Sequence, residues 1–78
     1  MPSVLAELNG IVQEVLGGIA SKSLLGRIAA ILADGSSSRE GLIQACTKVE
    51  KMVNLFIGAD KAQIIGKRFR ETLARTPV

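Results

Sequence analysis

Histidine, tryptophan and tyrosine are absent from this sequence, and cysteine occurs only once. Histidine is the side chain whose ordinary pKa lies nearest to neutral pH, so its absence removes the commonest general acid–base group and a common metal ligand. A metal site would have to combine Cys46 with carboxylates, which are scattered along the chain. The sequence therefore predicts a protein that is not an enzyme and has no catalytic residue, no metal site and no cofactor.

The lone cysteine excludes a disulfide within the chain. Cys46 shares a predicted helix face with Leu42, Val49 and Val53. A reactive cysteine needs exposure and a basic partner that lowers its pKa, and no histidine exists to provide one. Cys46 is therefore predicted to be a small buried hydrophobic residue.

Long uncharged apolar runs are also missing, because a charged residue breaks every apolar stretch within a few positions. This pattern excludes a membrane-spanning helix and predicts no membrane partner. No Lys or Arg precedes Lys22, and Glu7 and Glu14 interrupt the first apolar stretch, which argues against a signal peptide. Together with the single cysteine, these features predict a cytoplasmic protein.

Aromatic residues are limited to two phenylalanines, so a hydrophobic core must consist mainly of aliphatic side chains. These side chains recur at helical spacing in four successive segments, and no segment alternates as a strand does. The sequence thus predicts a single all-α domain over residues 1–78, folded as a compact four-helix bundle or an orthogonal helical array. The predicted helices run from Ser3 to Leu16, from Ser21 or Ser23 to Asp34, from Ser38 to Ile57 and from Asp60 to Arg75.

Each predicted helix has one apolar stripe, and the four stripes are expected to meet in one core. The stripe of the third helix also includes Ile43 and Phe56, and Gly66 borders the stripe of the fourth, where it predicts a close helix crossing. The residues predicted to be buried together are Leu8, Val12, Ile28, Leu32, Val49, Val53, Ile65 and Phe69.

Two helix starts have capping-box spacing, in which a short polar residue precedes Glu or Gln by three positions. Ser37 precedes Glu40 in this way, and Asp60 precedes Gln63. Ser37 and Asp60 are therefore predicted to be the N-caps of the third and fourth helices.

Positive charge is concentrated in residues 36–78, which carry eight Lys or Arg against four Asp or Glu, whereas residues 1–35 have a net charge of −1. Lys61, Arg68 and Arg75 recur every seven residues and share one face of the fourth helix, with Lys67 beside them. Two interpretations of this basic face are open. The favoured one is a surface that faces solvent or contacts a protein, and the other is a surface that contacts nucleic acid.

In the nucleic-acid alternative, the fourth helix is the second helix of a helix-turn-helix formed across Gly58-Ala59. The chain lacks the aromatic side chains that stack on single-stranded bases, which argues against that alternative.

Leu55 and Ile64 are apolar residues that lie off the stripes of their helices, on either side of the third connection. Together they predict a contact surface for a protein partner or a second copy of the chain, with the homodimer slightly favoured. The sequence as a whole predicts a small non-enzymatic protein–protein interaction module, such as an adaptor, a regulatory subunit or a homodimer. The alternative is a small basic nucleic-acid-binding regulator that uses the fourth helix.

Overall fold

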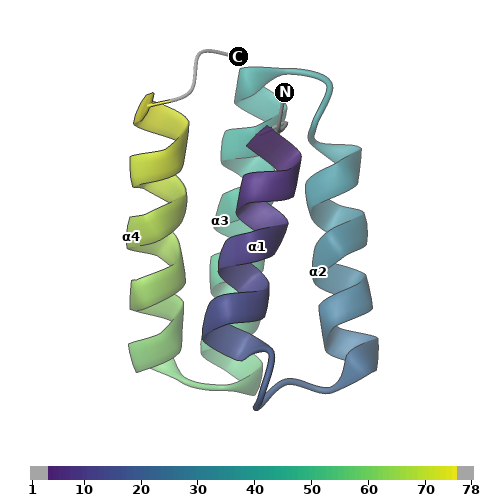
Figure 1. Ribbon diagram of the computed structural model, residues 1–78, viewed down its shortest axis with the longest axis vertical. Coiled ribbons are helices and arrows are strands. Elements are labelled where there is room, and N and C mark those ends of the chain that lie inside the picture. The colour runs from purple at the N-terminus through teal and green to yellow at the C-terminus, as the bar shows by residue number, and fades with distance from the viewer. Residues whose placement is uncertain (1–3, 76–78) are drawn as a thin grey trace.

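The computed structural model describes residues 4–75 of the chain. Over these residues it contains four helices and no strand: α1 (Val4–Leu16), α2 (Lys22–Asp34), α3 (Arg39–Phe56) and α4 (Ala59–Arg75) (Figure 1). All four predicted helices are confirmed, and their ends lie within one or two residues of the predicted ones wherever the structure describes them. Ser3, the predicted start of the first helix, lies outside the described residues.

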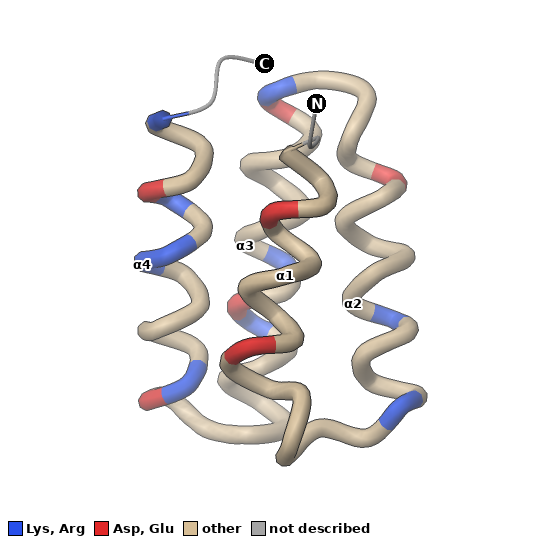
Figure 2. The backbone as a smooth tube through the Cα atoms, viewed as in Figure 1, with Lys and Arg blue, Asp and Glu red and all other residues tan. Residues whose placement is uncertain are grey.

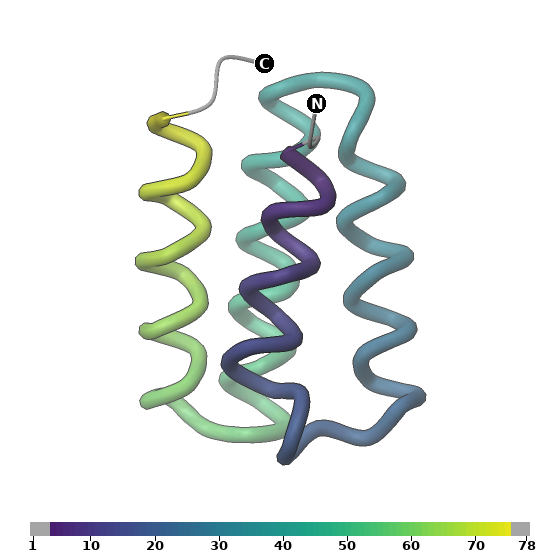
Figure 3. Tube along the Cα trace, in the orientation of Figure 1, coloured from purple at the N-terminus to yellow at the C-terminus, as the bar shows by residue number. Residues whose placement is uncertain are grey.

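The helices form a four-helix bundle in which each helix runs antiparallel to the next, so the all-α prediction is confirmed and the orthogonal array is excluded (Figure 1). The neighbouring helices are α1 and α2, α2 and α3, α3 and α4, and α4 and α1. Within the described part of the chain, no Cα atoms of the diagonal pairs α1–α3 and α2–α4 lie within 8 Å of each other. The connections at residues 17–21 and 57–58 lie together at one end, and the connection at residues 35–38 lies at the other (Figure 3). We call the first of these the two-loop end.

One hydrophobic core fills the space between the four helices, and its members come from every helix. All eight residues predicted to be buried together are buried in this core, so that prediction is confirmed. Phe69 is the largest of the fully buried side chains, and aliphatic residues surround it. Burial of these side chains is the main stabilising contribution, at about 25 cal/mol for each Å² of apolar surface removed from water.

The stripe of α3 is narrower than predicted. Ile43 and Phe56 are both exposed, with 46% and 65% of their surface accessible, so their predicted burial is wrong. Phe56 is the last residue of α3 and stands at the two-loop end, where α1 has already ended at Leu16 and α4 has yet to begin. The spacing along one helix cannot reveal that no neighbouring helix extends far enough to cover a side chain.

The close helix crossing at Gly66 stays a prediction. A Cβ atom at Gly66 would collide with the carboxylate of Glu50, the flexible end of a long side chain, so the glycine leaves room for this carboxylate. The α2–α3 connection contains a close approach of two backbones, because a Cβ at Gly41 would lie 2.6 Å from the backbone oxygen of Gly35.

The predicted N-cap of α3 is wrong by one residue. Ser38, not Ser37, precedes the helix, and its hydroxyl oxygen accepts a hydrogen bond from the backbone N–H of Gly41 at 2.9 Å. With Ser38 as the cap, the residue three positions later is Gly41, which has no side chain to complete a capping box. The close approach of Gly35 to Gly41 holds the connection in this register.

The predicted N-cap of α4 is also wrong, because Asp60 is already the second residue of the helix. Gly58 precedes the helix, and its carbonyl oxygen accepts a hydrogen bond from the N–H of Ala62 at 3.2 Å. Gly58 has a φ of +142°, a backbone conformation that residues other than glycine rarely adopt. The chain turns from α3 into α4 at this glycine, and no polar side chain among residues 4–75 caps the start of α4. Asp60 still contributes a negative charge near the positive end of the helix dipole.

Candidate interaction surfaces

Apolar side chains gather at the two-loop end of the bundle. Leu55 and Phe56, in the last turn of α3, have 81% and 65% of their surface exposed, and Ile19 in the α1–α2 connection has 56% exposed. Beside them, a hollow of about 370 Å³ is lined by the apolar side chains of Ile19, Leu24, Phe56 and Ile57, and also by Ser21, Ser23 and Arg27. We call Ile19, Leu24, Leu55, Phe56 and Ile57 the apolar end patch.

Three of the five large hydrophobic side chains that are exposed among residues 4–75 belong to this patch, whereas Ile43 and Ile64 stand singly on the sides of the bundle. Single exposed apolar residues are normal on a protein surface, whereas several of them at one end of a bundle favour a contact surface there. The patch is therefore the most distinctive apolar feature of the surface.

The structure does not bring Leu55 and Ile64 together. Leu55 is seven residues after Lys48, which lines the outer surface between α2 and α3. Ile64 is four residues before Arg68, which reaches towards α1. Since residues about two turns or one turn apart share a helix face, Leu55 and Ile64 lie on opposite sides of the bundle. Leu55 instead lies next to Phe56 in the last turn of α3, at the two-loop end.

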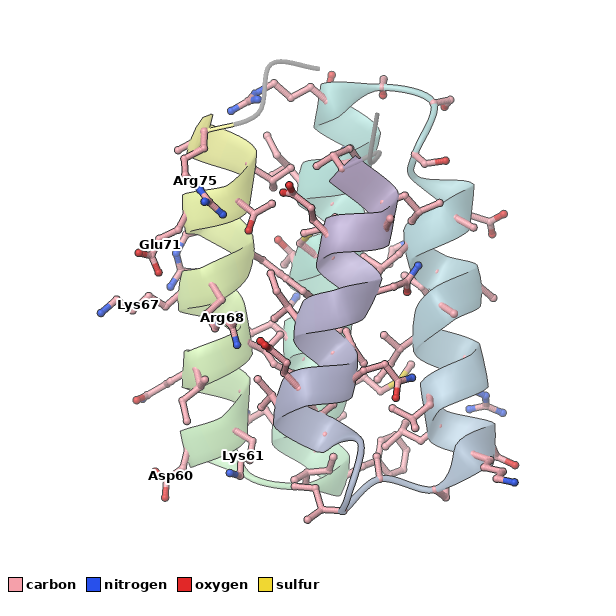
Figure 4. All side chains as sticks on the ribbon, viewed as in Figure 1. Asp60, Lys61, Lys67, Arg68, Glu71 and Arg75 are labelled. Atoms are coloured by element: carbon pink, nitrogen blue, oxygen red, sulfur yellow. The ribbon has the colours of Figure 1, made fainter. Side chains whose placement is uncertain are left out.

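The basic row of α4 faces acidic residues of α1. Arg68 forms an ion pair with Glu14, with 2.5 Å between Nη2 and Oε2. Glu7 precedes Glu14 by seven residues and Arg75 follows Arg68 by seven, so the antiparallel helices place Glu7 on the same side as Arg75. All four residues line one hollow of about 760 Å³ between α1 and α4. Figure 4 shows Arg68 directed from α4 towards α1, and Figure 2 shows the acidic positions of α1 facing the basic ones of α4.

This arrangement reduces the positive potential of the row. Both partners of the Arg68–Glu14 pair are substantially exposed, so the pair adds little to stability. Its consequence is electrostatic, because a guanidinium beside a carboxylate attracts a phosphate less strongly than a free one does. Lys61, the remaining member of the row, is half-buried and also turns towards α1, whereas Lys67 projects into solvent (Figure 4).

The helix-turn-helix arrangement that the sequence allowed does not form. Helices α3 and α4 run antiparallel along the bundle (Figure 1), whereas the two helices of that motif cross at about 90–120°. On the α3 side of α4, Arg70 lies 3.6 Å from Glu50 and the Arg39 guanidinium donates a hydrogen bond to the carbonyl oxygen of Leu73 at 2.9 Å. Basic side chains on this side therefore also have partners within the bundle.

Cys46 lies in the core beneath the α3–α4 surface, with 7% of its surface exposed, so the predicted burial is confirmed. Burial, and secondarily the negative charge of Glu50, raises the pKa of the Cys46 thiol to about 11. At neutral pH the sulfur is protonated and is a poor nucleophile. Across residues 4–75, no three Cys, Asp or Glu side chains come close enough together to hold a metal ion.

Of the apolar end patch, the sequence predicts only Leu55 as a contact residue. The two other exposed members are missed, because the spacing places Phe56 in the core stripe and gives Ile19 no role, and the partly buried Leu24 and Ile57 are also not predicted as contact residues. Ile19 directly follows Gly17-Gly18, and an isoleucine in a glycine-containing connection is the signal that could have identified it.

None of the helices within residues 4–75 has the length and apolar character that crossing a membrane requires. Comparison with protein-family models, with curated proteins and with solved structures finds no match to this chain.

Proposed function

We propose that this chain is a small non-enzymatic protein–protein interaction module, acting as an adaptor, a regulatory subunit or a homodimer, and that the apolar end patch is its contact surface. The observation that supports this proposal is the exposure of Ile19, Leu55 and Phe56 together at one end of the bundle. The apolar end patch replaces the contact surface of Leu55 and Ile64 that the sequence predicts, because these two residues lie on opposite sides of the bundle.

The chemistry of the patch suits a protein contact. Phe56 is one of only two aromatic residues in the chain, and aromatic side chains are enriched at the centres of interfaces because they bury a large area with few rotatable bonds. The hollow beside Phe56 gives the surface relief into which an apolar side chain of a partner fits. Each exposed side chain is withdrawn from unfavourable contact with water when a partner covers it.

Nucleic-acid binding through α4 is the alternative function. The pairing of Arg68 with Glu14 and the position of Glu7 on the same side as Arg75 both weaken the case for it. The exposed Lys67 and the half-buried Lys61 together provide too few phosphate contacts for appreciable affinity.

The proposal is tested by placing a photo-reactive amino acid at position 55 and irradiating the protein in its native cells. We expect protein adducts at position 55. A probe at position 43 is the matched control, because Ile43 is an exposed apolar residue of the same helix away from the two-loop end. Adding Phe56→Glu to the position-55 probe should abolish the adducts. Equal adduct yields at positions 55 and 43, or none at position 55, contradict the proposal.

A further inference from the structure

The two-loop end carries one exposed positive and one exposed negative side chain in addition to the apolar end patch. Lys22 is the first residue of α2 and Asp60 is the second residue of α4, and both helices begin at this end (Figure 1). Both side chains are exposed, and neither makes a hydrogen bond or an ion pair within the described part of the chain. Figure 4 shows Asp60 directed outward from the end of the bundle, while Lys61 beside it turns towards α1.

The positions of these two charges are related by the geometry of the bundle. Helices α2 and α4 occupy one diagonal of the bundle, while α1 and α3 occupy the other (Figure 1). A two-fold axis just beyond the two-loop end, parallel to the α1–α3 diagonal, exchanges the α2 side of one copy with the α4 side of the next. It therefore places Lys22 of each copy opposite Asp60 of the other.

The same axis brings the apolar residues together. Phe56 ends α3 and Ile19 lies in the α1–α2 connection, where both line the same hollow, so the axis brings this hollow of each copy against the two-loop end of the other. The result is an interface with an apolar centre and one opposite-charge pair on each side, which is the usual arrangement of a symmetric contact.

From this complementarity, and resting on the proposed interaction function, we propose that the occupant of the apolar end patch is a second copy of the chain, joined end to end about this two-fold axis. The bundle measures 30 × 20 × 20 Å, so its end offers a footprint on the order of 400 Å², about half of the ~800 Å² per partner that standard interfaces bury. An interface of this size lies at the small, weak end of specific protein contacts, so we expect association only at high protein concentration.

Sedimentation equilibrium of the purified protein from about 10 µM to 1 mM measures this association. Two charge reversals, Lys22→Glu and Asp60→Lys, each place like charges opposite one another twice in the symmetric dimer. Each variant alone should therefore dissociate at least about tenfold more readily than the parent. Lys67→Glu, which reverses a charge on the exposed side of α4, should leave the association unchanged within twofold.

A mixture of the two charge-reversal variants gives the sharpest result. In a mixed dimer, Glu at position 22 of one copy faces Lys at position 60 of the other, and the native Asp60 faces the native Lys22. The mixture should therefore associate at least as well as the parent although neither variant does so alone, and the double variant Lys22→Glu/Asp60→Lys should recover self-association. Circular dichroism of each variant checks that the helices are intact.

A protein that stays monomeric to about 1 mM, or a mixture that associates no better than its components, overturns the end-to-end dimer. These results are distinct from failure of the proposed function. Adducts of position 55 with other proteins, combined with a monomeric pure chain, overturn the self-association and leave the interaction function standing. Absence of adducts at position 55 overturns the interaction function itself.

Discussion

Single serine side chains cap the beginnings of α2 and α3. The hydroxyl oxygens of Ser21 and Ser38 each accept a hydrogen bond from a backbone N–H that the first turn of the helix leaves without a partner. At the other end of α2, the hydroxyl of Ser36 donates to the carbonyl oxygen of Ala33 at 2.7 Å. These bonds satisfy backbone groups at little cost, because the side chains are short and already lie beside the helix.

The cap of α3 provides a prediction with a built-in control. Ser38→Ala removes the bond to the N–H of Gly41 and should lower the free energy of unfolding by about 1 kcal/mol. Ser37→Ala changes the adjacent serine, which is exposed and caps no helix, and should change that free energy by less than about 0.5 kcal/mol. Urea denaturation of both variants measures the difference. Equal effects would mean that the helix begins at Arg39 for reasons unrelated to Ser38.

Glycines within the helices divide into two groups at the scale of the element. A Cβ at Gly10 in α1 or at Gly26 in α2 would meet no atom within 4 Å, whereas one at Gly41 in α3 would meet the backbone of Gly35. Glycine lowers helix stability relative to alanine because its backbone loses more conformational freedom on folding. Packing therefore explains Gly41 but offers no reason for Gly10 or Gly26.

Alanine substitution tests this division. Gly10→Ala and Gly26→Ala should each raise the free energy of unfolding by up to about 1 kcal/mol, because both positions are helical and open. Gly41→Ala should lower it by about 1–3 kcal/mol, since the new Cβ would lie 2.6 Å from a backbone oxygen that cannot move without reshaping the connection. Thermal unfolding distinguishes the two directions, and a stabilised Gly41→Ala variant would show that the connection adapts freely.

The paired charges of α1 and α4 make a further prediction at this scale. If α4 binds duplex DNA, the triple variant Lys61→Gln/Arg68→Gln/Arg75→Gln should weaken binding and flatten its salt dependence by roughly one unit for each phosphate interaction that it removes. Because Arg68 is paired with Glu14 and Glu7 lies on the same side as Arg75, we expect no appreciable binding by the parent at physiological salt and a folded triple variant. Fluorescence anisotropy at two salt concentrations measures the binding, and circular dichroism checks the fold. Tight, salt-sensitive binding by the parent would reverse the ranking of the two functions.

The two phenylalanines have opposite roles in the molecule as a whole. Phe69 is 1% exposed at the centre of the core, whereas Phe56 is largely exposed at the two-loop end. Phe69 therefore contributes to the stability of the bundle, whereas Phe56 is accessible to a partner.

Truncation of each phenylalanine should show this separation. Phe69→Ala should lower the free energy of unfolding by about 3–5 kcal/mol, because it leaves a large cavity among aliphatic neighbours. Phe56→Ala should change it by less than about 1 kcal/mol when measured at low protein concentration, where association does not contribute. Chemical denaturation at a few micromolar compares the two. A large effect of Phe56→Ala under these conditions would assign that residue to the fold and not to the contact surface.

The four helices, their approximate ends and the eight central core residues follow from the sequence alone. Each depends on periodicity within one segment, as in Leu8 and Val12 of α1 or Ile65 and Phe69 of α4, and a helix places such residues on one face wherever it packs. The burial of Cys46 was predictable for the same reason.

Only the tertiary structure decided which surfaces remain uncovered and which charges face one another. The exposure of Phe56 depends on where α1 ends and α4 begins, and the pairing of Arg68 depends on Glu14 of a helix that lies more than fifty positions earlier in the chain. The register of Ser38 depends likewise on the approach of Gly35 to Gly41. These features arise between segments, and the spacing of residues within one segment carries no information about its neighbours.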